Sequence, residues 1–79
     1  MTKESAIEVI KEALSESLGR PVLEIDSSTG LESHGLDSLG VIEFVTVLED
    51  KLGFNLSPKD SVGVSSIEKL ADVIVKKKG

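Results

Sequence analysis

Hydrophobic positions recur at steps of three and four in three segments of the chain, residues 5–18, 38–52 and 65–76. Such spacing places side chains on one face of an α-helix, with polar residues opposite. No segment shows the alternation and flanking turn signals of a strand. The pattern therefore predicts an all-α bundle of three main helices, with a core made of Ile7, Ile10, Leu14, Phe44, Val45, Leu48, Ile67, Leu70 and Ile74.

Helix-capping residues flank the first segment. Ser5 and Glu8 have the spacing of a capping box, and Thr2 offers an alternative start one turn earlier. Gly19 followed by Pro21 predicts that this helix stops before residue 20.

The two later helices carry similar signals. Asp37 is the expected N-cap of the second helix, and Gly53 supplies its C-terminal stop. The serine–proline pair at residues 57–58 predicts a short additional helix. Ser65 and Glu68 match a capping box for the last helix.

A long irregular loop, residues 20–36, separates the first two helices. Loops of this length are uncommon in compact domains and are often functional. The hydrophobic residues of this loop are expected to pack against the core and hold the loop there. They are Val22, Leu23, Ile25, Leu31 and Leu36.

The second helix is the most informative segment. Its predicted core face holds Val41, Phe44, Val45, Leu48 and Leu52. The opposite face and its flank hold Leu39, Ile42, Glu43, Thr46, Glu49 and Asp50. Single exposed aliphatic residues are ordinary, but Leu39 and Ile42 lie beside Ser38 and among carboxylates, which indicates a docking patch.

The charge of the chain is unevenly distributed. The net charge is −5, yet no lysine or arginine occurs between Arg20 and Lys51, where seven acids stand. Such a surface repels nucleic acid and attracts basic proteins, although a merely solvated acidic face is the alternative. The lysines at residues 76–78 suit the C-terminus of the last helix, where the helix dipole favours cations.

Composition narrows the classes of protein further. Seventy-nine residues suit one domain, residues 1–79, and the absence of cysteine excludes disulfides, thiolate metal sites and a thiol nucleophile. No segment has the apolar run of a signal peptide or of a membrane span. A cytoplasmic monomer is the expectation.

Nothing in the sequence assembles a catalytic site. Around Ser38 the esterase pattern G-x-S-x-G fails because Leu36 occupies the first glycine position. His34 is the only histidine, and a lone loop histidine is more often solvated or capping than catalytic. The acidic loop has Leu31 where a calcium loop needs glycine. We therefore expect a non-enzyme without a metal site.

The segment GLDSL, residues 35–39, resembles the motif of the acyl carrier protein family. The resemblance covers nearly the whole chain, including a long loop before an acidic second helix, and the approach to the motif by Glu24, Ile25, Asp26, Thr29 and Leu31. It implies a bundle of three main helices and one short helix.

The resemblance implies that a phosphopantetheinyl transferase moves 4'-phosphopantetheine from coenzyme A onto Ser38, between Asp37 and Leu39. The thiol of this group would carry acyl groups as thioesters between enzymes that load and process them. Those enzymes would have basic docking surfaces and contact Leu39, Ile42, Glu43, Thr46, Glu49 and Asp50.

Three positions depart from the housekeeping fatty-acid carriers of that family. Leu36 replaces a usual alanine, Gly40 a usual aspartate and Thr46 a common methionine. We therefore expect a specialised free-standing carrier for polyketide, unusual fatty-acid or lipid-modifying chemistry. The alternative is an unmodified acidic helical adaptor that docks basic proteins.

Overall fold

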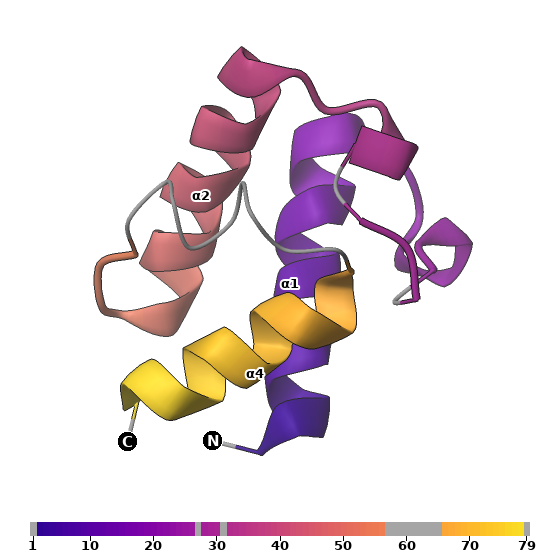
Figure 1. The fold of residues 1–79 in the computed structure, drawn as a ribbon. Coiled ribbons are helices and arrows are strands. Elements are labelled where there is room, and N and C mark those ends of the chain that lie inside the picture. Colours follow the sequence, from indigo (N-terminus) through magenta and orange to yellow (C-terminus); the bar gives the residue numbers. More distant parts are fainter. Residues whose placement is uncertain (1, 27, 31, 57–65, 79) are drawn as a thin grey trace.

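The computed structural model shows a bundle of helices (Figure 1). It describes residues 2–26, 28–30, 32–56 and 66–78, and for residues 32 and 38 the backbone alone. In chain order the elements are α1 (Lys3–Leu18), the short 3-10 helices η1 (Val22–Glu24) and η2 (Glu32–His34), α2 (Ser38–Leu52) and α4 (Ile67–Lys78).

Helix α1 is the central element, because it packs against both α2 and α4. In Figure 1 α1 begins and α4 ends at the bottom of the bundle, while α2 begins at the top. No strand occurs in the ranges that the structure describes. The predicted all-α class is confirmed.

The core is formed mainly by the residues that the hydrophobic spacing predicted. Eight of the nine predicted core residues are buried, and Ile7 is partly buried against the same cluster. Val41 and Leu52 from α2 and Ala71 from α4 are also buried. One contiguous cluster therefore joins the three helices, as the helical period requires.

The start of α1 differs from the first expectation. Thr2 is the N-cap, and its side-chain oxygen accepts the Ser5 amide proton at 3.1 Å. The Ser5 hydroxyl bonds back to Thr2, so the capping box joins these two residues, not Ser5 and Glu8. Both starts present a capping hydroxyl, and the alternative start at Thr2 is confirmed.

The ends of α2 are as predicted. The Asp37 carboxylate accepts the Gly40 amide proton at 2.7 Å and thereby caps the first turn. At the other end Gly53 takes the left-handed conformation with φ of 80°, and its amide donates to Glu49 O. The Lys51 ammonium group also lies 3.0 Å from the Glu16 carboxylate, which joins α2 to α1.

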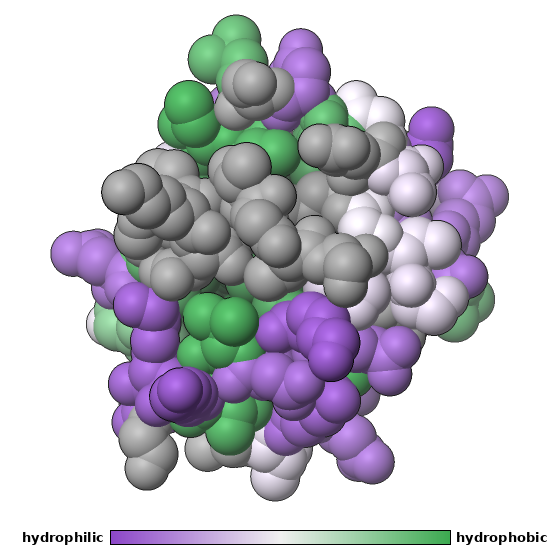
Figure 2. Space-filling model, viewed as in Figure 1, coloured by the Kyte–Doolittle hydropathy of each residue, from purple (hydrophilic) through white to green (hydrophobic). Residues whose placement is uncertain are grey.

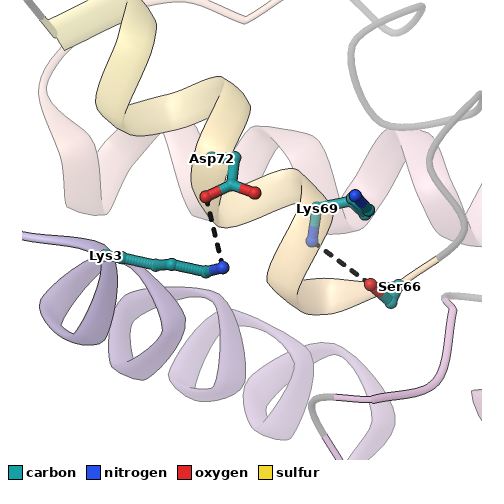
Figure 3. A network of polar contacts seen from close by, with 4 residues as sticks. All are labelled: Lys3, Ser66, Lys69 and Asp72. Atoms are coloured by element: carbon teal, nitrogen blue, oxygen red, sulfur yellow. Dashed lines mark hydrogen bonds and ion pairs between the residues drawn. The ribbon is translucent and has the colours of Figure 1, made fainter.

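At the start of α4 the described cap is Ser66, whose side-chain oxygen accepts the Lys69 amide proton at 3.2 Å (Figure 3). The predicted capping box used Ser65, which lies outside the described residues, as does the predicted short helix from residue 57. Figure 3 also shows Lys3 reaching Asp72 at 3.3 Å. Both side chains are half-exposed, so this ion pair adds little stability.

The loop between α1 and α2 is anchored at fewer points than expected. Ile25 and Leu36 are buried as predicted. The prediction for Val22 and Leu23 is wrong, because they lie on the short turn η1 and Leu23 is 98% exposed. No residue of η1 is buried, and Ile25, which follows the turn, is the residue that enters the core here. Leu31 lies outside the described residues.

Candidate functional site

Ser38 is the first residue of α2, at the top of the bundle in Figure 1. The first four amides of a helix lack intrahelical acceptors, and here the Asp37 carboxylate satisfies one of them, that of Gly40. The Val41 amide bonds to Asp37 O at 2.9 Å and begins the helical ladder. The amides of Ser38 and Leu39 come before that bond and have no intrahelical acceptor. The first turn of α2 therefore favours an anion such as a phosphodiester.

The surface next to Ser38 is hydrophobic. Leu39 is 66% exposed and Ile42 is 52% exposed, as the helical spacing predicted. Figure 2 shows hydrophobic surface at the top of the molecule, over the beginning of α2. Single exposed aliphatic side chains are ordinary, but these two belong to the first two turns of one helix and form a small hydrophobic patch next to its start.

Acidic residues follow the hydrophobic pair along the helix. Glu43 and Asp50 are exposed, and among the described residues their carboxylates contact no cation. The outer face of α2 therefore divides into a hydrophobic part near Ser38 and an acidic part farther along. We call Leu39, Ile42, Glu43 and Asp50 together the outer face of α2.

Two further residues of the predicted docking set make local contacts. The Thr46 hydroxyl is exposed and donates to Ile42 O at 3.0 Å. Glu49 is only partly exposed, and its carboxylate accepts the Leu56 amide proton at 2.6 Å. This bond fixes the chain after α2. No sequence pattern predicts this bond, because the partner of the Glu49 carboxylate is a backbone amide seven residues away.

His34 is more deeply buried than expected for a lone histidine in a loop. It is 8% exposed, and among the described residues it is the one polar residue that is buried as a whole. Its Nε2 lies 2.7 Å from the Thr29 hydroxyl oxygen and 3.3 Å from Asp26 O. The Asp26 carbonyl can only accept, so the tautomer with a proton on Nε2 is the one in which His34 donates to it. Burial shows that the histidine is not solvated, whereas its contact with the Asp26 carbonyl agrees with the capping alternative.

This cluster ties the loop to the bundle just before the site. The Thr29 carbonyl accepts the amide proton of Ile67, the first residue of α4, at 3.0 Å. Thr29 thus connects His34, four positions before Ser38, with another helix. His34 Nε2 is directed to these loop oxygens, so the ring helps to hold the loop in place before α2.

Asp26 stabilises the same loop through its carboxylate. Its Oδ1 accepts both the amide proton and the hydroxyl proton of Ser28, at 2.8 and 2.7 Å. These bonds favour the ionised carboxylate and lower the pKa of Asp26, with a smaller contribution from the nearby His34.

Other kinds of site are not found in the described ranges. They contain no group of three His, Cys, Asp or Glu side chains placed to hold a metal ion. None of the described helices is both long and apolar enough to cross a bilayer.

Comparison with known proteins gives a consistent result. The phosphopantetheine attachment site family matches residues 8–74, which is most of the chain. An acyl carrier protein of Exiguobacterium sp. is 39% identical over 74 residues, covering 92% of this chain and 86% of that protein. An acyl carrier protein of Saccharopolyspora erythraea is 32% identical over 68 residues, covering 85% and 72%.

The chain is also similar to short parts of much larger proteins. It is 38% identical over 63 residues to 6-hydroxymellein synthase of Talaromyces verruculosus, a match that covers 80% of this chain and 2% of that synthase.

Proposed function

This chain belongs to the acyl carrier protein family, which carries a covalently attached 4'-phosphopantetheine group, and we propose that Ser38 is the residue that holds it here. The observation that supports this choice is the position of Ser38 at the start of α2. The amides of the first turn and the Asp37 cap fit a phosphodiester at that point.

In the proposed attachment, the Ser38 hydroxyl oxygen forms a bond to the phosphorus that carries pantetheine in coenzyme A. The pyrophosphate bond of coenzyme A breaks, the nucleotide leaves with the other phosphate, and the proton of the serine hydroxyl passes to a base of the transferase. The transferase supplies the catalysis. This chain contributes the hydroxyl and the amides of the first turn of α2, whose dipole favours the phosphodiester.

The attached group supplies a thiol, which the chain lacks because it contains no cysteine. We propose that acyl groups travel on this thiol as thioesters between separate enzymes. The chain itself then acts as a carrier without catalytic activity of its own, presenting the cargo at the end of α2.

We propose that the outer face of α2 binds the transferase and the acyl-loading and acyl-processing enzymes. Leu39 and Ile42 provide apolar contacts beside Ser38, and Glu43 and Asp50 attract basic residues of the partner. Thr46 lies on the same face. The Glu49 carboxylate already accepts the Leu56 amide proton, and its remaining lone pairs can accept hydrogen bonds from a partner.

The proposed setting is specialised acyl chemistry, of the polyketide, unusual fatty-acid or lipid-modifying kind. Leu36, Gly40 and Thr46 support this, together with the similarity to a 6-hydroxymellein synthase. We further propose a single-domain monomer in the cytoplasm. The shared core of α1, α2 and α4 supports one domain, and the net charge of −5 opposes self-association.

Thiol titration tests the carrier function. The protein is incubated with coenzyme A, magnesium and a broad-specificity phosphopantetheinyl transferase, freed of coenzyme A, and treated with a thiol reagent. We expect about one thiol per chain, which must come from the attached group because the sequence has no cysteine. Absence of any thiol, with a known carrier modified in parallel, would instead support the unmodified adaptor.

A further inference from the structure

Three loop residues before α2 form one hydrogen-bonded group, which we call the His34 cluster: Asp26, Thr29 and His34. The Asp26 carbonyl accepts the Thr29 hydroxyl proton at 2.8 Å, and His34 Nε2 lies 2.7 Å from that hydroxyl oxygen and 3.3 Å from the carbonyl oxygen. Burying a polar side chain is costly unless it finds hydrogen-bond partners. The two loop oxygens are such partners, so the burial of His34 depends on the arrangement of this part of the loop.

The His34 cluster is attached to the helices on the side away from Ser38. Ile25, just before the cluster, is buried in the core. The Thr29 carbonyl accepts the amide proton of Ile67, the first residue of α4, at 3.0 Å. The first amides of a helix have no intrahelical acceptor, so this bond satisfies one of the free amides of α4.

On the other side, three residues with fixed positions connect the His34 cluster with Ser38. Gly35 turns the chain with a φ of 86°, Leu36 is buried in the core, and Asp37 caps α2. In Figure 1 this short connection leads from η2 over the top of the bundle into α2. The surface that leads up to Ser38 is therefore arranged by the cluster at one end and by the helix cap at the other.

We propose that His34 is a positioning residue for the attachment at Ser38, because the His34 cluster keeps the loop in one arrangement next to the residue that the transferase must reach. This inference rests on the proposed function. The partner that it concerns is the transferase, which has to bind around Ser38 and the chain that leads into it. A loop that is already held in place costs less conformational entropy to bind than one that is ordered on contact.

The proposal predicts where a loss of the cluster appears in the kinetics. The hydrogen bonds of the His34 cluster are the same before and during the transfer, since none of their atoms takes part in the proposed reaction. Weakening them should therefore raise the KM for the carrier and leave kcat unchanged. The loss of one or two hydrogen bonds corresponds to a rise of about two- to tenfold.

Two substitutions separate the hydrogen bonds of His34 from its bulk. His34→Leu fills the buried position without a donor, whereas His34→Gln keeps an N–H donor at the end of the side chain. Both are modified with coenzyme A, magnesium and a broad-specificity phosphopantetheinyl transferase. We expect the leucine variant to show the raised KM and the glutamine variant to recover much of the parent value. Ser33→Ala, an exposed loop control, should match the parent.

Amide hydrogen exchange, followed by NMR, shows whether the cluster itself has opened. We expect the Ile67 amide to exchange faster in His34→Leu than in the parent or in His34→Gln, because its acceptor is the Thr29 carbonyl. Thr29→Val removes the hydroxyl and keeps the branched shape, so it opens the cluster in a second way and takes the place of His34→Leu if that variant does not fold. Combined in one chain, the two substitutions should raise the KM less than the product of their separate effects.

An unchanged KM in a folded variant whose Ile67 amide exchanges faster would overturn the proposal, because the loop could then move without consequence for the transferase. Unchanged exchange in every variant, or an equal rise in KM for His34→Leu and His34→Gln, would also overturn it, since the hydrogen bonds of His34 would not be the cause. Failure of the proposed function looks different. In that case the parent protein gains no phosphopantetheine, while exchange of the Ile67 amide still reports on the cluster.

Discussion

Leu48 and Leu39 are the same residue type on one helix, and they lie on opposite faces of it. Leu48 is fully buried in the core cluster, whereas Leu39 is 66% exposed beside Ser38. Hydrophobic spacing alone separates the two faces of α2. The contrast shows that the inner face of this helix forms part of the core, while the outer face is the one that we propose binds other proteins.

The largest effect is expected on the inner face. Leu48→Ala leaves a cavity in a filled core and should lower the free energy of unfolding by about 2–5 kcal/mol, measured by urea denaturation. In so small a domain this loss is large enough to unfold part of the population. A loss below about 0.5 kcal/mol, the range of ordinary surface substitutions, would place Leu48 outside the core.

The matched changes on the outer face should spare the fold. Leu39→Ala and Ile42→Ala should alter the free energy of unfolding by less than about 0.5 kcal/mol. In binding to a transferase they should mainly speed dissociation, with a loss of about 1 kcal/mol or more if each is a central contact. Surface plasmon resonance gives both rates. Unchanged dissociation would remove these two residues from the docking surface.

Charge on the outer face should act on a different step. Charge reversal at Glu43 or Asp50 should mainly slow association, and it should weaken the salt dependence, because attraction between exposed charges is screened beyond roughly 10 Å at 0.1 M salt. Reversal at Glu8 on α1 and Glu68 on α4 is the control. If the controls slow association equally, net charge matters and the outer face of α2 has no special role.

The smallest expected effect concerns the loop that precedes α2. Hydrogen bonds from Ser28 hold the pKa of Asp26 below its usual value. A carboxylate with a lowered pKa in the folded state contributes stability above its unfolded pKa, near 3.9, and loses it as pH falls through the lower folded value. Ser28→Ala should raise the pKa of Asp26 in an NMR titration, and an unchanged value would contradict this cause.

Sequence reasoning succeeded where a local signal was unambiguous. Asp37 and Gly53 bound α2 because each is the preferred residue type for its end of a helix. The exposure of Leu39 and Ile42 followed from the helical period. Each of these inferences needs only the neighbouring residues.

The missed features depend on contacts between distant or irregular segments. His34 is buried because Thr29 and Asp26 offer it acceptors, which no periodic pattern records. Leu23 is exposed because a three-residue turn has no repeating face. Leu36 packs so close to Gly40 that a Cβ atom at position 40 would lie 3.0 Å from Leu36 Cδ2. This proximity follows from the path of the loop into α2, which composition does not reveal.

Intact-protein mass spectrometry of the parent, Ser38→Ala and Ser33→Ala tests the central claim most directly. After incubation with coenzyme A and a transferase, the parent and Ser33→Ala, an exposed loop serine used as the control, should each gain one phosphopantetheine. Ser38→Ala should gain none while keeping its helical circular dichroism, since the cap at Asp37 is untouched. Modification of Ser38→Ala, or of none of the three proteins, would contradict the assignment of Ser38 as the attachment residue.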